Sequence, residues 1–308
     1  MRNAFAEEAA NLAREDEQYF LLSGDIGNRL FNTYKARFSE RFLNCGVAEA
    51  NMTGVAAGMA MAGLRPMTYT IAAFNTARCL EQIRVDVCYH NLPVTIVGVG
   101  AGLSYAGLGY THHATEDIAM MRVLPNMTVL CPGDVAEVRA AMHAAHRHDG
   151  PVYIRLGKKG EPNVHTGLPD FQIGKAITLS DGDEVCLLGV GTSLPEVETA
   201  ARLLTDKGVS VRLVSFHTIK PLDYALLTEI FETFKVVSLI EEHSCLGGAG
   251  SAVAEWLAAQ SNYNAKFISI SLPDEIFQQA GTQEHARRKL GLLAQDIARK
   301  VLLALETG

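Results

Sequence analysis

The chain has 308 residues, of which 48% are hydrophobic and 20% are charged, and its formal net charge is −7. This length suggests about two globular domains, and the composition excludes a disordered chain. The negative charge disfavours nucleic-acid binding, because a phosphate backbone would be repelled on average.

The N-terminal segment MRNAFAEEAANLARED alternates charged residues and alanine as a helix does, and it contains no signal-peptide core. The longest uncharged stretch, Ala50 to Leu64, is too short to span a bilayer. The six cysteines are scattered without a CxxC pair, which is typical of thiols in a reducing compartment. These features predict a soluble cytoplasmic protein that does not bind membranes.

Short apolar runs alternate with helical patterns through the first half of the chain. The predicted strands, each bounded by Gly, Pro or Asn, are residues 19–24, 41–46, 66–71, 93–100, 127–131 and 151–156. Helical spacing occurs over Glu49–Met61, Ala77–Tyr89 and Asp134–His146, and Asp134 is predicted to cap the last of these helices. Strands separated by helices indicate parallel βαβ units.

Residues 157–174 interrupt this alternation with several Gly and Pro residues and are predicted to form a linker. A second alternation follows, with strands at 184–191, 209–216, 235–242 and 265–272. Helices are expected at 194–205, 223–231 and 249–259, and from about residue 284 to the end. The predicted fold class is α/β, with two domains (1–160 and 174–308), each a mainly parallel sheet covered by helices on both faces.

Glycine clusters follow two of the predicted strands, as they do in nucleotide-binding proteins. After Gly98–Gly102 and after Gly189–Gly191, a leucine (Leu103 and Leu194) stands where the GxGxxG fingerprint requires its third glycine, and no GxxxxGK[ST] is present. The clusters are typical of tight turns at strand ends. A nicotinamide-dependent dehydrogenase is therefore disfavoured.

A more specific pattern is NCGVAEANMTGVAAGMAMAGLRPM, residues 44–67. The strand ends at Gly46 and a helix starts near Ala48, which places Glu49 at the carboxyl edge of the sheet, where α/β proteins bind ligands. The helix is almost entirely Gly, Ala and Met, and it permits close packing against another element. From these residues alone, Glu49 is either a functional carboxylate or a helix-start carboxylate stabilised by the helix dipole.

This segment resembles the pyrimidine-binding domain shared by transketolase, 1-deoxyxylulose 5-phosphate synthase and the decarboxylating component of 2-oxo acid dehydrogenases. The resemblance continues through CLEQIRVDVCYHNLPV and through YTHHATEDIAMMRVLPNMTVLCPGD, which contains the TH motif of the family. In the second half, GVGTSLPE, HTIKPLD, EEHSCLGGAGSAVAE and LPDEIFQQAGTQEHARRKLG are similar to the family's C-terminal domain, most closely to that of the synthase. The chain is identified as a member of the transketolase superfamily, whose cofactor is thiamine diphosphate bound with Mg²⁺.

The resemblance implies roles for residues around the aminopyrimidine ring of the cofactor. A glutamate like Glu49 shares a proton with the ring nitrogen N1′ and favours the imino tautomer. Phe74 stands where the family stacks an aromatic ring on the pyrimidine; Tyr69 is the alternative, and Phe74 could also be a core residue. Asp25, in LLSGDIG, resembles an acidic residue near the cofactor or is a solvent-exposed turn residue.

Two further residues are implied to meet the substrate. His112 aligns with the histidine of the TH motif, and imidazole is suited to proton transfer near neutral pH. The adjacent His113 also suggests a metal site, but neighbours in sequence rarely point at one ion, so no metal ligand is predicted. Arg155 aligns with an arginine that holds a sugar phosphate, with Lys158 and Lys159 nearby; a surface ion pair is the alternative interpretation.

Departures from the family pattern argue against the usual phosphorylated ketose substrate. Leu108 stands where transketolase has an aspartate just before the TH motif, and Ala50 replaces a histidine of the synthase. The segment VGVGAGLSYAG also lacks the first phosphate-binding arginine of the synthase. Leu108 therefore suggests a less hydroxylated substrate.

The GDG…N motif, with which the family binds the diphosphate and Mg²⁺, has no counterpart, because SDGDE at 180–184 does not fit it. A partner subunit carrying this motif is therefore expected, in an αβ pair or an α₂β₂ tetramer with the cofactor at the interface. The Gly/Ala helix after Glu49 is expected to pack against a partner, including a second copy of this chain.

The sequence predicts the catalytic half of a split, thiamine diphosphate-dependent transketolase that transfers a two-carbon ketol unit between sugars or sugar phosphates. The alternatives are a synthase that decarboxylates a 2-oxo acid and condenses the product with an aldehyde, a beta-type subunit of a 2-oxo acid dehydrogenase, and a non-catalytic paralogue. The presence of both Glu49 and His112 argues against the last of these.

Overall fold

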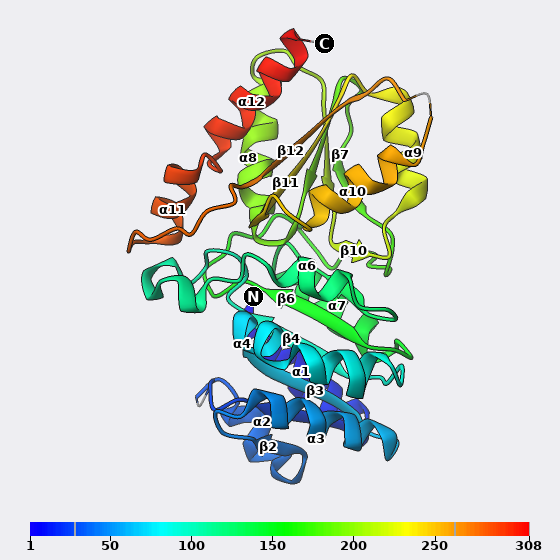
Figure 1. Ribbon diagram of the computed structural model, residues 1–308, viewed down its shortest axis with the longest axis vertical. Helices are drawn as coiled ribbons and strands as arrows, with labels where there is room; N and C mark the ends of the chain where they lie inside the picture. Colours follow the sequence, from blue (N-terminus) through cyan, green and yellow to red (C-terminus); the bar gives the residue numbers. More distant parts are fainter. Residues whose placement is uncertain (28, 262, 308) are drawn as a thin grey trace.

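The structure is a computed structural model that describes residues 1–27, 29–261 and 263–307. It contains two sheets, one above the other, with the N-terminus near the level where the two halves meet and the C-terminus at the far end of the second half (Figure 1). All six cysteines lie in the described part of the chain and are free thiols.

The first sheet has seven strands in the order β10-β5-β6-β4-β3-β1-β2. Six of them pair in parallel: β1 (Tyr19–Ser23), β2 (Phe42–Asn44), β3 (Arg65–Ile71), β4 (Thr95–Val99), β5 (Thr128–Leu130) and β6 (Val152–Leu156). Each of them overlaps a predicted range, so the predicted strands of the first half are confirmed. The seventh, β10 (Thr218–Lys220), comes from the second half of the chain and pairs antiparallel with β5.

Helices cover both faces of the first sheet, as predicted. On one face lie α1 (Arg2–Glu15), α2 (Asn32–Arg37) and α7 (Val135–His146). On the other lie α3 (Glu49–Met61), α5 (Leu80–Gln82) and α6 (Asp117–Arg122), and α4 (Ala72–Thr76) directly follows β3. Asp134 caps α7 as predicted, since its Oδ1 accepts a hydrogen bond from the N–H of Glu137 at 3.0 Å.

The helix predicted over residues 77–89 is present but irregular. It consists of a 3₁₀ turn (Ala77–Cys79), α5 and a π-helical segment (Ile83–Cys88) in succession. Such π-helical segments are often found at functional sites. This one begins shortly after Arg78, whose side chain contacts Glu49.

The predicted linker, residues 157–174, contains no helix or strand and leads to the second sheet. That sheet has the order β12-β11-β8-β9-β7. Its strands are β7 (Ile177–Ser180), β8 (Val185–Gly189), β9 (Val211–Ser215), β11 (Val236–Ser244) and β12 (Lys266–Leu272). The four predicted strands are confirmed and pair in parallel, whereas β7 was not predicted and pairs antiparallel with β9.

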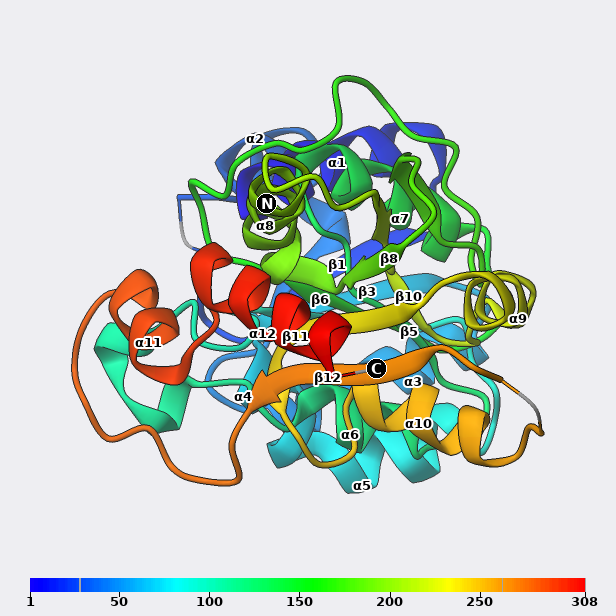
Figure 2. The same cartoon turned by 90° about the horizontal axis from the view of Figure 1, so that it is seen from above.

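Helices also cover both faces of the second sheet (Figure 2). One face is covered by α8 (Leu194–Thr205) and α12 (Ala294–Glu306), and the other by α9 (Tyr224–Thr233) and α10 (Ala249–Ala258). The single final helix predicted from residue 284 is wrong. It is divided into α11 (Gln283–Leu290) and α12, because Gly291 adopts a left-handed conformation with φ 69° and ends α11.

The two halves share part of their hydrophobic core. One cluster of buried residues includes Val129 of β5 together with Val214 and Phe216 at the end of β9. Together with the exchange of β10, this cluster joins the sheets into one body. The exact domain limits, 1–160 and 174–308, stay a prediction.

Candidate functional site

The parallel strands β1 to β4 end at one edge of the first sheet, and four of the predicted site residues lie in the segments that follow them: Asp25, Glu49, Phe74 and His112. After β2, a short turn leads to Glu49, the first residue of α3. Asn44 supports this turn by accepting a hydrogen bond from the N–H of Gly46 at 2.9 Å. The side chain of Glu49 is 1% exposed. A carboxyl group is therefore buried at the sheet edge where the sequence predicts a ligand site.

Two neighbours lie close to the Glu49 side chain. Its Oε2 accepts a hydrogen bond from Nη1 of Arg78 at 2.7 Å, and the Arg78 side chain is 46% exposed. The backbone after β1 also approaches closely, since a Cβ on Gly24 would lie 3.4 Å from Cγ of Glu49 and 3.0 Å from Cβ of Thr70. Glycine at position 24 therefore lets this part of the chain approach Glu49.

Phe74 and His112 complete the group. Phe74 lies on α4, and the guanidinium of Arg78 lies 4.4 Å from the centre of its ring. The ring centres of Phe74 and His112 are 5.2 Å apart, with the rings at 63° to each other. Arg78 thus links Glu49 to Phe74, and Phe74 contacts His112, so residues from three different segments of the first domain gather at this edge.

Asp25 and Tyr69 differ in their positions. Asp25 is exposed just after β1 with φ 57°, and its Oδ1 accepts a hydrogen bond from Nδ2 of Asn44 at 2.9 Å. Tyr69 is buried within β3, with its ring stacked on Phe5 at 4.9 Å and perpendicular to Phe31 at 5.0 Å. Its ring faces are occupied by the core, so of the two candidate aromatics only Phe74 borders Glu49 and His112.

Arg155 does not lie where a substrate phosphate could reach it. The side chain is fully buried, and its Nε donates to Asp117 Oδ2 at 2.8 Å. Its Nη2 donates to the carbonyl oxygens of Ala114 at 2.7 Å and Glu242 at 3.0 Å. The assignment of Arg155 to phosphate binding is therefore corrected to a structural role between the two halves of the chain. Sequence alignment placed the residue on the right strand but could not show that its guanidinium points into the protein.

Lys158, which the sequence analysis names only as a neighbour of Arg155, is a cation beside the loop that carries His112. Its Nζ lies 5.2 Å from the ring centre of Tyr105, and that ring lies 6.3 Å from the ring of His112. Burial raises the pKa of the Tyr105 hydroxyl, partly offset by the nearby charge of Arg2. The tyrosine hydroxyl is therefore neutral at neutral pH, and the ring contacts both Lys158 and His112.

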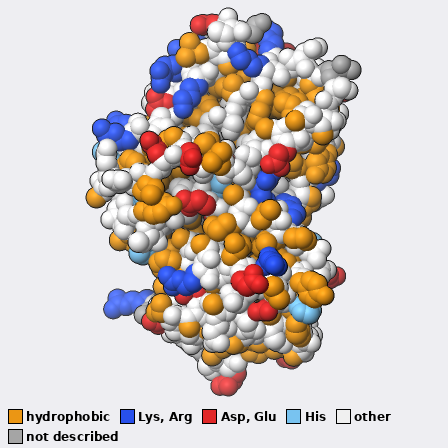
Figure 3. All heavy atoms as spheres, viewed as in Figure 1, with side chains coloured by type: hydrophobic (Ala, Val, Ile, Leu, Met, Phe, Trp, Pro, Cys, Tyr) orange, Lys and Arg blue, Asp and Glu red, His pale blue; other side chains and the backbone are white. Residues whose placement is uncertain are grey.

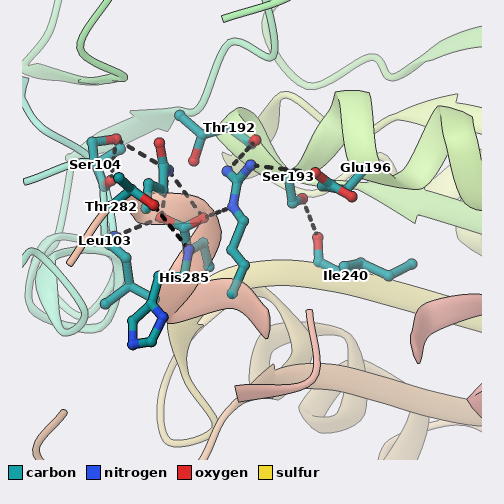
Figure 4. A network of polar contacts seen from close by, with 12 residues as sticks. Leu103, Ser104, Thr192, Ser193, Glu196, Ile240, Thr282 and His285 are labelled. Carbon is teal, nitrogen blue, oxygen red and sulfur yellow. Dashed lines mark hydrogen bonds and ion pairs between the residues drawn. The ribbon is translucent and has the colours of Figure 1, made fainter. Parts of the chain in front are cut away.

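A polar network from the second domain supports the loop that carries His112 (Figure 4). The carboxylate of Glu242 accepts hydrogen bonds from the N–H of Leu103 at 2.5 Å, from Gln283 Nε2 at 2.9 Å and from Arg287 Nε at 2.5 Å. Arg287 also donates to the carbonyl oxygen of Thr192 at 2.8 Å. The sequence did not predict this network: Thr192, Glu242, Gln283 and Arg287 all lie in motifs that resemble the family, but those motifs do not show that the residues meet in space.

His112 and His113 point in different directions. His112 contacts Phe74 and Tyr105, whereas the buried His113 contacts Tyr110 and Phe277. Burial lowers the pKa of His113, although the backbone of Ala106 and nearby acidic residues partly oppose the shift. The two rings therefore do not converge on one point.

Comparison with known proteins decides the family. Residues 1–162 match the model described as the transketolase pyrimidine-binding domain, and residues 174–297 match the transketolase C-terminal domain. The chain belongs to the transketolase family. The resemblance stated from the sequence motifs is thus confirmed.

Transketolase relatives cover nearly the whole chain. A putative transketolase C-terminal section from Methanocaldococcus jannaschii is 32% identical over 305 residues, which are 98% of this chain and 95% of that protein. The 6-deoxy-6-sulfo-D-fructose transketolase subunit SqwH from a Clostridium species is 34% identical, over 97% of this chain and 92% of that protein. A solved structure described as a split gene transketolase, inactive beta4 tetramer, has a TM-score of 0.89 and 36% identity, over 99% of this chain and 97% of that chain.

Transketolases depend on thiamine diphosphate, and one end of this cofactor fits the site. A buried carboxyl beside an aromatic ring and a histidine suits the aminopyrimidine. The diphosphate needs a cation held by oxygen ligands, and in residues 1–27, 29–261 and 263–307 no group of three His, Cys, Asp or Glu side chains could hold a metal ion. Across the same residues, no helix has the length and apolar character needed to cross a membrane.

Proposed function

We propose that this chain is the pyrimidine-binding half of a split, thiamine diphosphate-dependent transketolase, which transfers a two-carbon ketol unit between sugars or sugar phosphates. The observation that carries the proposal is the grouping of Glu49, Phe74 and His112 at one edge of the first sheet. The cofactor, when bound, supplies the carbon nucleophile and the electron sink.

Each residue of the group has a role that its surroundings support. Glu49 shares a proton with the ring nitrogen N1′ of the cofactor, and its burial keeps water from competing for that hydrogen bond. Phe74 offers its ring for offset stacking. His112 is the proton donor and acceptor for the substrate oxygen, and Asp25 borders the cofactor from the end of β1. Lys158 attracts an anionic end of the substrate.

We further propose that a partner subunit supplies the diphosphate and Mg²⁺ site, in an α₂β₂ heterotetramer. The relatives described as a C-terminal section and as a subunit support this division, and the tetramer of beta chains alone is described as inactive. Helix α3 presents Asn51, Gly58 and Met61 at the surface, which suits close packing against the partner or a second copy. The cytoplasmic location stays a prediction from the sequence.

This chain lacks the aspartate that transketolase has just before the TH motif and that contacts the hydroxyl groups of the sugar. Leu108 occupies that position and is 58% exposed. Figure 3 shows one face of the molecule, on which hydrophobic side chains are interspersed with charged ones. A substrate with fewer hydroxyl groups than xylulose 5-phosphate is therefore proposed. A Leu108→Asp variant with an unchanged substrate profile would count against this choice.

Reconstitution tests the proposal. This chain is mixed with a subunit that carries GDG…N, and products are analysed with ketose donors and aldose acceptors, with and without pyruvate. Ketol transfer without pyruvate supports the transketolase. Pyruvate decarboxylation with condensation identifies the synthase instead, and tight binding of thiamine diphosphate by this chain alone would refute the split site.

A further inference from the structure

Arg78 contacts both Glu49 and Phe74, the two residues that are proposed to bind the aminopyrimidine ring. Its Nη1 donates to Oε2 of Glu49 at 2.7 Å, and its guanidinium lies 4.4 Å from the ring centre of Phe74. One side chain thus makes both the hydrogen bond to the buried carboxyl and the contact with the aromatic ring that the cofactor would otherwise make.

These contacts have a physical cause in the chain without cofactor. A buried carboxylate without a partner is strongly unfavourable, and the guanidinium supplies a charge-assisted hydrogen bond. The planar guanidinium also stacks well on an aromatic ring. Arg78 therefore stabilises Glu49 and Phe74 in their places.

The position of Arg78 also allows its side chain to move away from Glu49 and Phe74. Glu49 is 1% exposed, whereas the Arg78 side chain is 46% exposed. The arginine thus lies between the carboxyl and the solvent. It belongs to a short 3₁₀ turn, Ala77–Cys79, rather than to a strand of the sheet. Its long side chain can swing into water at the cost of one half-exposed ion pair and one ring contact.

We propose that Arg78 is a displaceable cover over the cofactor's ring site, which holds Glu49 and Phe74 ready and leaves them when the aminopyrimidine binds. This inference rests on the proposed function, because it takes Glu49 as the partner of N1′. It assigns to Arg78 control of cofactor affinity, and it explains how a buried carboxylate is tolerated before assembly with the partner subunit.

If Arg78 acts as a cover, its removal should change cofactor affinity in the direction opposite to the one that electrostatic attraction alone predicts. Thiamine diphosphate is anionic, so removing a nearby cation should weaken its binding if Arg78 only attracts it. A cover instead lowers the apparent affinity by the fraction of molecules in which the site is closed. Its removal should therefore tighten binding, by roughly three- to tenfold for a half-exposed contact of this kind.

The test is a titration of the reconstituted complex with thiamine diphosphate in the presence of Mg²⁺, followed by equilibrium dialysis rather than by activity. Arg78→Ala and Arg78→Gln should both lower the dissociation constant. Arg84→Ala is the matched control, since Arg84 lies in the π-helical segment that follows, is 57% exposed and pairs with Glu81 outside the site; it should leave binding unchanged.

The outcomes separate the two proposals. If the wild-type complex does not bind the cofactor, the proposed function fails. If the wild type binds but both Arg78 variants bind equally or more weakly, the cover is overturned while the proposed function stands. Melting temperatures check that each variant is folded, and the glutamine variant, which keeps a polar side chain, maintains the test if the alanine variant is unstable.

Discussion

Glu242 on β11 accepts a hydrogen bond from the backbone N–H of Leu103, with 2.5 Å between Oε1 and N. Leu103 begins the loop that carries His112, and two backbone hydrogen bonds between Gly102 and Ala114, of 3.0 and 2.9 Å, close the base of that loop. A Cβ on Gly102 would lie 2.6 Å from Oε1 of Glu242, so a side chain at position 102 would collide with the carboxylate. The second domain therefore fixes the base of the loop that bears His112.

We expect Glu242→Gln to lower kcat by roughly ten- to hundredfold, because small displacements of a catalytic group have effects of this size. An amide group would turn a donor toward either Leu103 or Arg287, both of which also donate. Affinity for the cofactor should stay unchanged, because Glu49 and Phe74 are not touched. Steady-state kinetics and cofactor titration measure the two quantities. Glu255→Gln, which breaks an exposed pair with Arg122, is the control.

Parts of the fold and the site could be predicted from the sequence where neighbouring residues form a recognisable pattern. The turn before Glu49 and the strands of both sheets carry their signals in adjacent residues, so sequence reasoning located them. Glu242 lies 139 residues from Leu103, and nothing in either segment announces the contact. Arg78 was missed because a single arginine in an irregular helix has no signature. Arg155 was misjudged because alignment reports a position in the chain and not the direction of the side chain.

Substitutions of Arg155 and Lys158 should have different effects: the first on the stability of the fold, and the second on substrate binding. Arg155→Ala leaves Asp117 buried without its ion-pair partner, so the free energy of unfolding should fall by about 3–5 kcal/mol. Lys158→Ala should leave stability within about 0.5 kcal/mol of wild type. It should raise KM for a phosphorylated acceptor roughly tenfold, with no such change for an uncharged sugar. An Arg155 variant of normal stability that had lost only phosphate preference would restore the original assignment.

Substitutions of Phe74 and Tyr69 should likewise separate an effect on cofactor binding from an effect on stability. Phe74→Leu removes the proposed stacking surface, so the dissociation constant of the cofactor should rise by roughly two- to twelvefold, corresponding to about 0.5–1.5 kcal/mol. Tyr69→Leu should leave this constant unchanged but lower the melting temperature, because the ring packs between Phe5 and Phe31. Weaker cofactor binding in the Tyr69 variant, with normal binding in the Phe74 variant, would reverse the choice of aromatic residue.

The linker should contribute a pH-dependent part of the stability. His165 binds Asp134 through Nδ1 at 3.0 Å and lies 3.5 Å from Glu137. Burial alone would lower the pKa of His165, but the hydrogen bond with Asp134 and the two negative charges outweigh it and raise the pKa. Burial would likewise raise the pKa of Asp134, but hydrogen bonds from His165 and from the Glu137 backbone hold it at about 2.

The sign of the effect follows from linkage. A raised histidine pKa stabilises the fold fully below the unfolded pKa of about 6.5, and this contribution is lost as the pH rises through the folded value. In urea unfolding, the stability advantage of wild type over His165→Asn should therefore shrink as the pH rises from about 6.5 through the raised pKa of His165. Burial, and to a smaller extent the charge of His165, lowers the pKa of His217 to about 3, so this buried ring stays neutral in the folded protein throughout this pH range. An advantage that grew with pH would contradict the assigned pair.

Glu49 carries the most direct prediction for catalysis. In the reconstituted complex, Glu49→Gln should lower kcat by roughly 10²–10⁴-fold, the usual contribution of a positioned proton-sharing group. The dissociation constant of the cofactor should change much less, because the amide can still form a hydrogen bond with the ring. Glu81→Gln is the control, since Glu81 is exposed and pairs only weakly with Arg84. Full turnover by Glu49→Gln would mean that this carboxyl, although buried beside Phe74 and His112, does not activate the ring.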